Sequence, residues 1–86
     1  MDSFRVRWKQ SAVRELRSLP ATVVVRVVAA VTDLATDPHP PGSKKLAGSQ
    51  HTYRIRIGDY RVVYDVLAAE LIVEVVRVAH RRDVYR

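Results

Sequence analysis

The chain has 86 residues, of which 48% are hydrophobic, and a formal net charge of +6 with a pI near 10.3. This composition excludes a disordered chain and fits one domain over residues 1–86. The absence of cysteine excludes disulfides and thiolate metal sites and fits a reducing cytoplasm, and no apolar run reaches the roughly 18 residues of a membrane span. The positive charge predicts a polyanionic partner, either nucleic acid or an acidic protein.

The first half of the chain predicts one strand followed by two helices. Apolar and basic residues alternate over 3–9, which is typical of a half-buried strand. Ser11 is expected to cap a first helix that carries its apolar stripe on Ala12, Val13, Leu16 and Leu19. Valines at three- and four-residue spacing predict a second helix over 21–36, although so many β-branched residues disfavour a helix unless tertiary packing overrides them.

The second half predicts a loop and then three antiparallel strands. Residues 37–50 contain three prolines and two glycines and are expected to form a loop. Residues 52–66 alternate with period two on both sides of Gly58-Asp59, which is typical of a two-residue hairpin turn. The last strand is expected over 71–79, after a turn at 68–69 that would place Val76 opposite Arg61 and Glu74 opposite Val63.

The expected fold is therefore an α+β domain of the order β-α-α-β-β-β. Its sheet would be four-stranded and mostly antiparallel, with the two N-terminal helices packed on one face. The other face would stay open to a ligand.

The hairpin over 52–66 places like charges opposite each other on that open face. With the turn at 58–59, Arg56 faces Arg61 and Arg54 faces Val63, so three arginines gather on one side of the sheet. Directly opposed like charges destabilise a hairpin by up to about 1 kcal/mol. We therefore expect this face to hold an anion. The alternative interpretation is an ordinary solvated outer face of an antiparallel sheet.

The remaining side chains limit the chemistry. The three histidines are scattered, the acidic residues are isolated, and there is no glycine-rich phosphate loop, no nucleophile elbow and no metal-ligand spacing, so neither a metal nor a cofactor is expected. Arginine, histidine and tyrosine suit RNA cleavage by the 2′-hydroxyl of the substrate itself. Such an enzyme orients the phosphate, stabilises its charge and moves protons.

Three stretches of the sequence resemble the RelE/ParE superfamily of bacterial toxin–antitoxin toxins, namely KKLAG, YRIRIGDYRVVYDV and VVRVAHRRDVYR. The resemblance covers nearly the whole chain and implies the same α+β fold. In the RelE branch it implies an mRNA endoribonuclease that enters the ribosomal A site, cuts the exposed codon and inhibits translation. It also implies a cognate protein antitoxin, expected to be acidic, that wraps and neutralises the toxin.

The same resemblance implies roles for individual residues. Arg56 and Arg61 would bind the scissile phosphate, and Arg81 would neutralise the leaving side. Because an arginine is not deprotonated in proteins, the proton-transfer role falls to His80. Tyr85 would stack on a base. The residues expected to follow the RNA backbone are Lys44, Lys45, Arg54 and Arg82.

Two other functions remain open on the sequence alone. A ParE-type inhibitor of DNA gyrase would share the fold without nuclease activity, and its family has a similar H-x-R-R-D type ending. A non-catalytic module that binds only RNA or an antitoxin would also suit the charge. An acidic protein encoded beside the chain would support a toxin and count against a free-standing RNA-binding module.

Overall fold

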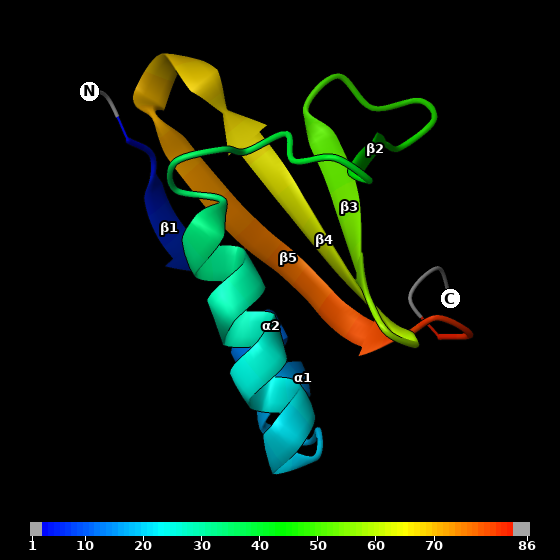
Figure 1. The fold of residues 1–86 in the computed structure, drawn as a ribbon. Helices are drawn as coiled ribbons and strands as arrows, with labels where there is room; N and C mark the ends of the chain where they lie inside the picture. The colour runs from blue at the N-terminus through cyan, green and yellow to red at the C-terminus, as the bar shows by residue number, and fades with distance from the viewer. Residues whose placement is uncertain (1–2, 84–86) are drawn as a thin grey trace.

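The computed structural model describes residues 3–83. The elements along the chain are β1 Arg5–Trp8, α1 Gln10–Arg17, α2 Ala21–Asp33, β2 Lys44–Lys45, β3 Thr52–Ile57, β4 Tyr60–Leu67, a short 3₁₀ helix Ala68–Glu70 and β5 Ile72–His80. The strands form one sheet in the order β1-β5-β4-β3-β2. Figure 1 shows both helices running together beside β5. The predicted α+β class is confirmed.

The sheet has five strands rather than the predicted four. The additional strand β2 lies inside the predicted loop, where Lys44 pairs with Arg54 and Lys45 with Tyr53. Two adjacent lysines have no hydrophobic alternation, so only their pairing with β3 reveals the strand. The first strand, β1, pairs with β5 in parallel, while the other pairings are antiparallel. The sheet is therefore mixed but mostly antiparallel.

The hairpin of β3 and β4 has the predicted turn and the predicted register. Gly58 adopts a positive φ of 60°, which glycine tolerates without a steric cost. Ile57 pairs with Tyr60, Arg56 with Arg61 and Arg54 with Val63. The period-two pattern and the turn residues were sufficient here because both strands are adjacent in sequence.

The register of β4 with β5 differs from the prediction. The turn is longer than two residues, because Ala68–Glu70 form a 3₁₀ helix and Leu71 adopts a left-handed conformation with φ 54°. A β-bulge then shifts the pairing between Val63 and Tyr64 of β4. Arg61 consequently pairs with Ala79, not with Val76, and Val63 pairs with Arg77, not with Glu74.

The helices lie close to their predicted positions. Helix α1 begins at Gln10 after an extended Lys9 and has no side-chain cap, so the predicted cap at Ser11 is wrong. Helix α2 ends at Asp33, three residues before the predicted end. Neither helix of residues 3–83 has the length and apolar character required to cross a membrane.

The hydrophobic core lies between the helices and one face of the sheet. It is made of buried residues from α1, α2, β3, β4 and β5 together with Leu34, which directly follows α2. These residues are Ala12, Val27, Val31, Leu34, Ile55, Ile57, Val62, Tyr64, Val66, Val73, Val75 and Val78. Burial of this valine-rich set explains why residues 21–33 are helical despite their weak intrinsic preference. The opposite face, which we call the open face, carries the arginines.

Tyr64 connects this core to the loop that precedes β2. Its side chain is fully buried, and its hydroxyl donates a hydrogen bond of 2.7 Å to the carbonyl oxygen of Pro38. Burial raises the pKa of Tyr64 from 10.0 to about 12 because the charged phenolate would lose its hydration. The fold therefore favours the neutral form of this side chain.

This pKa shift predicts a loss of stability at alkaline pH. The contribution of neutral Tyr64 is complete below pH 10 and decreases as the pH rises towards 12, because the unfolded chain releases the proton first. The expected slope is about 1.4 kcal/mol per pH unit within this window. Urea unfolding at several pH values should show this slope in the wild type and lose it in Tyr64→Phe. The control Tyr53→Phe, in the same stack of rings, should keep it.

Candidate functional site

Three arginines from two adjacent strands form a cluster on the open face. Arg54 and Arg56 belong to β3, and Arg61 belongs to β4 directly opposite Arg56. We call these three residues the arginine cluster. Paired residues share a face of the sheet, so the cluster lies on the side opposite Ile55, Ile57 and Val62, which pack against the helices. The predicted gathering of the three arginines is confirmed.

The members of the cluster differ in burial. Arg56 is exposed, whereas Arg61 is only 8% exposed and donates from Nη1 to the carbonyl oxygens of Tyr60 at 3.1 Å and Gly58 at 3.4 Å. Arg54 is half-buried, and its buried Nη1 atom has no acceptor among residues 3–83. A buried donor without an acceptor costs about 1–3 kcal/mol. The half-buried guanidinium group of Arg54 therefore adds partly desolvated positive charge to the cluster.

The predicted RNA-binding lysines lie beside this cluster. Lys44 pairs with Arg54 and shares its face, while Lys45 pairs with Tyr53 and lies on the other side of β2. Both lysine side chains are exposed. The structure therefore adds Lys44, but not Lys45, to the positive charge of the open face.

A small apolar group separates the arginines on the open face. Val63 and Ala79 are 5% and 8% exposed, and Leu46 packs against them. Figure 1 shows the β3–β4 turn and the end of β5 at the same end of the sheet. This end therefore combines desolvated positive charge with an apolar floor, a combination that suits the phosphates and bases of a single-stranded nucleic acid.

His80 lies on the other side of the sheet from the arginine cluster. It pairs with Tyr60, and the two rings meet edge to face with centroids 5.5 Å apart. Its Nδ1 accepts a 3.3 Å hydrogen bond from the backbone N–H of Arg82. The predicted placement of His80 beside the arginines is therefore wrong. It assumed an unbroken strand, and the β-bulge reverses the parity of the residues that follow it.

Arg81 lies at the β3–β4 turn, next to the arginine cluster in the sheet. Its backbone N–H donates to the carbonyl oxygen of Asp59 at 2.7 Å, and its Nε atom lies 4.0 Å from the Asp59 carboxylate. Arg82 is exposed, and Tyr85 lies outside the described residues. Of the predicted residues at the carboxyl end, the structure brings Arg81 to the cluster through this turn.

The structure adds Arg77, which the sequence analysis missed. Its pairing with Val63 places it on the open face, across Val63 from Arg54. Its guanidinium group reaches Glu15 of α1, with an Nη2–Oε2 distance of 2.8 Å. The sequence shows that Arg77 is basic, but the face on which it lies depends on the β-bulge, which the sequence pattern does not reveal.

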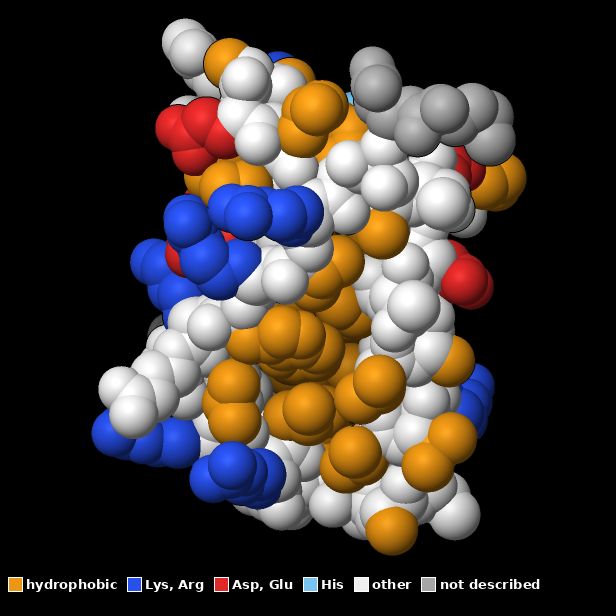
Figure 2. All heavy atoms as spheres, turned by 90° about the vertical axis from the view of Figure 1, so that its left-hand side faces the viewer, with side chains coloured by type: hydrophobic (Ala, Val, Ile, Leu, Met, Phe, Trp, Pro, Cys, Tyr) orange, Lys and Arg blue, Asp and Glu red, His pale blue; other side chains and the backbone are white. Residues whose placement is uncertain are grey.

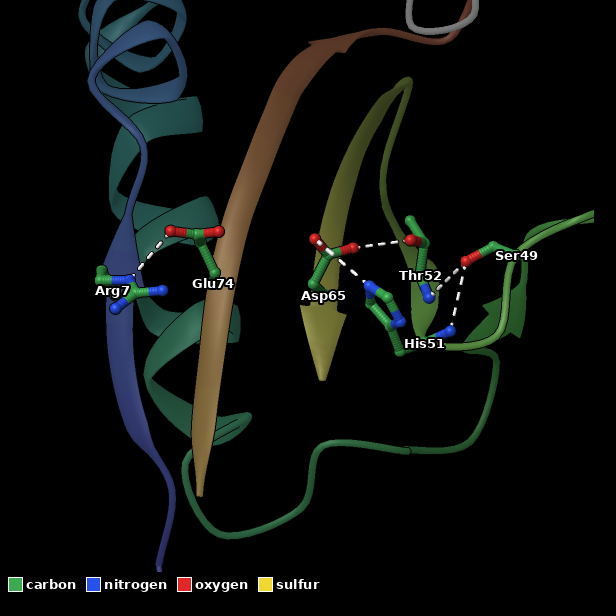
Figure 3. Close-up of polar contacts among 6 residues, drawn as sticks. All are labelled: Arg7, Ser49, His51, Thr52, Asp65 and Glu74. Atoms are coloured by element: carbon green, nitrogen blue, oxygen red, sulfur yellow. Dashed lines mark hydrogen bonds and ion pairs between the residues drawn. The ribbon is translucent and has the colours of Figure 1, made fainter. Parts of the chain in front are cut away.

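The far end of the open face has the opposite character. Asp65 and Glu74 are paired across β4 and β5, and each carboxylate has partners (Figure 3). Glu74 binds Arg7 at 2.9 Å, and Asp65 accepts a 2.6 Å hydrogen bond from Thr52 and lies 4.0 Å from His51. These carboxylates would repel phosphates, so a polyanion is expected to bind at the other end of the open face, near the β3–β4 turn.

A second surface lies on the side that carries β1 and the helices. Val25 and Val28 of α2 are 69% and 41% exposed, and we call this surface the valine face. Figure 2 shows hydrophobic side chains gathered down the middle of this side, with most of the Lys and Arg side chains towards the left border. Strand β1 is the end strand of the sheet, so its outer edge has no strand partner within residues 3–83. Such a surface is typical of a protein-binding site.

Comparisons with known proteins identify relatives over almost the whole chain. Residues 6–85 match the family described as the ParE toxin of the type II toxin–antitoxin system parDE. Toxin RelG of Mycobacterium tuberculosis is 36% identical over 87 residues, covering 96% of this chain and 97% of the relative.

Solved structures that resemble the fold include complexes of toxins with their partners. The M. tuberculosis RelBE2 complex contains a chain with a TM-score of 0.81 and 31% identity, covering 92% of this chain and 99% of the other. The RelE–RelB complex of Pyrococcus horikoshii gives 0.82 and 29%, with coverage of 93% and 97%.

Proposed function

The chain belongs to the RelE/ParE superfamily of toxins from type II toxin–antitoxin systems, and from this premise we propose that it is a ribosome-dependent mRNA endoribonuclease. The observation that carries the proposal is the arginine cluster on the open face. Arg56 lies directly opposite Arg61, and opposed like charges destabilise a sheet. A bound RNA phosphate would offset this repulsion.

The proposed reaction uses the RNA as its own nucleophile. The 2′-hydroxyl oxygen bonds to the adjacent phosphorus, the bond from phosphorus to the 5′-oxygen breaks, and the products are a 2′,3′-cyclic phosphate and a 5′-hydroxyl. The attacking hydroxyl loses a proton and the leaving oxygen gains one. The protein then has to position the phosphate and stabilise the charge on its oxygens.

The structure supports a division of labour among the basic residues. Arg56 and Arg61 would bind the non-bridging oxygens, because a guanidinium group suits bidentate contacts with phosphate. Arg81, held at the turn by Asp59, would neutralise the leaving side. Arg54 and Lys44 would follow the RNA backbone. Arg82 and Lys45 add positive charge nearby, and base stacking by Tyr85 remains an expectation from the family resemblance.

The position of His80 changes its proposed role. His80 lies on the helix side of the sheet, so its side chain is not on the face that carries the arginine cluster. Its Nδ1 atom already accepts a hydrogen bond from the Arg82 N–H. We therefore propose that His80 supports the turn that carries Arg81. Water would accept the proton of the attacking hydroxyl and donate a proton to the leaving oxygen. This assignment makes transition-state electrostatics the main contribution of the protein.

The proposed partner is the cognate antitoxin, an acidic protein that neutralises the toxin. The two similar solved structures described above are a toxin–antitoxin complex and a RelE–RelB complex, which supports a protein partner of this kind. The valine face and the unpaired edge of β1 offer it an apolar contact and a strand edge. The basic residues of α1, which include Arg14 and Arg17, would attract its acidic side chains.

Inhibition of DNA gyrase is the second candidate function. The observation that favours it is the match of residues 6–85 to the ParE toxin family. The same basic open face would then contact a protein or DNA, without a chemical step.

The nature of the RNA ends tests the proposed reaction. Programmed ribosomes incubated with the purified protein should yield cuts within translated codons, mapped by primer extension. The downstream fragments should carry a 5′-hydroxyl that polynucleotide kinase labels without prior dephosphorylation. Fragments with a 5′-phosphate would contradict the mechanism. Absence of cuts, together with inhibition of gyrase supercoiling, would establish the second candidate instead.

A further inference from the structure

The last strand, β5, loses its neighbour halfway along its length. Strand β1 pairs with β5 from Ile72 to Val75, and its final contact is a 3.0 Å hydrogen bond from the Lys9 N–H to the Val75 carbonyl oxygen. The chain then turns into α1. The second half of β5, from Arg77 to His80, therefore has β4 on one side and no strand on the other within residues 3–83.

Glu15 of α1 takes the place of the missing strand. Its Oε1 atom accepts a 2.9 Å hydrogen bond from the backbone N–H of Val78, as a strand carbonyl would. Its Oε2 atom accepts hydrogen bonds from Arg77, at 2.8 Å from Nη2 and 3.3 Å from Nε. The side chains of Glu15 and Arg77 are 29% and 31% exposed, so this carboxylate is partly shielded from water.

A hollow of about 310 Å³ opens beside these contacts, and the residues that line it include Glu15, Leu19, Tyr60 and His80. Apolar packing joins α1 to β5 through buried Ala12, and the carboxylate of Glu15 adds a polar link to the half of β5 that has no second strand neighbour.

The position of this half-strand matters for the proposed site. The β-bulge re-aims the chain immediately before Arg77, and the residues that follow pair Ala79 with Arg61 and join Arg81 to Asp59. A displacement of the half-strand would therefore move Arg81 relative to Arg61.

We propose that Glu15 is a positioning residue that fixes the carboxyl half of β5 and thereby sets Arg81 beside the arginine cluster. The proposal rests on the proposed function for its effect on cleavage, but not for its effect on the strand. Arg77 contributes by orienting the carboxylate towards the Val78 N–H.

Three substitutions separate the two contacts of Glu15. Glu15→Ala removes both contacts, Glu15→Gln keeps an oxygen for the Val78 N–H, and Arg77→Met removes the ion pair while leaving the Glu15 carboxylate in place. The matched control is Glu74→Ala, which breaks the 2.9 Å ion pair with Arg7 on the half of β5 that β1 covers.

Amide hydrogen exchange tests the strand without any need for activity. We expect Glu15→Ala to accelerate exchange at Arg81, whose N–H is bound to Asp59, by tenfold or more, with Val62 in the core unchanged. In Glu15→Gln the exchange rate at Arg81 should stay within a few-fold of the wild-type rate. In Glu74→Ala it should equal the wild-type rate. Unchanged exchange at Arg81 in Glu15→Ala would overturn the proposal. An equal acceleration at Val62 would also overturn it, since the role would then be general stability.

Single-turnover cleavage on programmed ribosomes tests the consequence. Glu15→Ala should lower the rate at saturation by tenfold or more with little change in the half-saturating concentration, and Glu15→Gln should recover most of it. A Glu15→Ala rate equal to that of Glu74→Ala would overturn the positioning role. If the wild type cleaves no RNA, the proposed function fails, and the exchange at Arg81 alone decides whether Glu15 fixes the strand.

Discussion

Replacing Arg61 with alanine is expected to lower the rate of mRNA cleavage about 100- to 1,000-fold, the usual effect of removing one preorganised donor from a developing oxyanion. Arg61 is only 8% exposed, so its guanidinium charge is weakly screened by water and acts strongly on a nearby phosphate. Arg61→Lys should recover only part of the rate, because lysine keeps the charge but loses the bidentate geometry. Single-turnover cleavage on programmed ribosomes measures both variants.

Two controls define what a loss of activity in Arg61→Ala means. Arg5→Ala removes an exposed arginine from the same face on the distant strand β1, and it should change the rate less than threefold or so because it lies outside the proposed phosphate site. His80→Ala should also have a smaller effect than Arg61→Ala, since His80 lies on the helix side. An equal loss in Arg5→Ala would indicate a general effect of charge and would remove Arg61 from the site.

Placing a charge on the valine face is expected to separate neutralisation from toxicity. Val28 is 41% exposed, so Val28→Glu should fold and retain cleavage. In a complex, the new carboxylate would lose its hydration within an apolar contact, next to an acidic partner. We expect the Kd for the antitoxin to rise by about 30- to 1,000-fold, which corresponds to a loss of about 2–4 kcal/mol at an interface hot spot.

The control for this prediction is a charge elsewhere on the same helix. Thr22→Glu adds the same carboxylate to α2 at an exposed polar position about a third of a turn away from Val28. Titration of each purified toxin with the protein encoded beside its gene measures the Kd, and growth of cells expressing both proteins measures neutralisation. If Val28→Glu binds as tightly as Thr22→Glu, the antitoxin docks elsewhere.

The Arg61 and Val28 variants give opposite patterns if both proposals hold. Arg61→Ala should be harmless to cells and still bind the antitoxin, whereas Val28→Glu should be toxic even when the antitoxin is present. The two surfaces lie on different faces of the molecule, so their effects should be additive in the double variant.

Local features of the sequence determined the hairpin and the arginine cluster. The turn residues Gly58-Asp59 and the period-two alternation on either side are sufficient to set which residues share a face, because the two strands are adjacent and pair without an intervening element. The spacing of the valines likewise determined α2, since the helical period follows from the side chains that must face the core. The family resemblance then pointed to the functional class.

Only the tertiary structure decided the features that depend on contacts between distant segments. The two-residue strand β2 exists through its pairing with β3, and the β-bulge near Val76 is defined only by the pairing of β5 with β4. That bulge placed His80 on the helix side and Arg77 on the open face. The bond of Glu15 to Val78 spans 63 residues of sequence. No local pattern encodes such contacts, because each one follows from how complete elements pack.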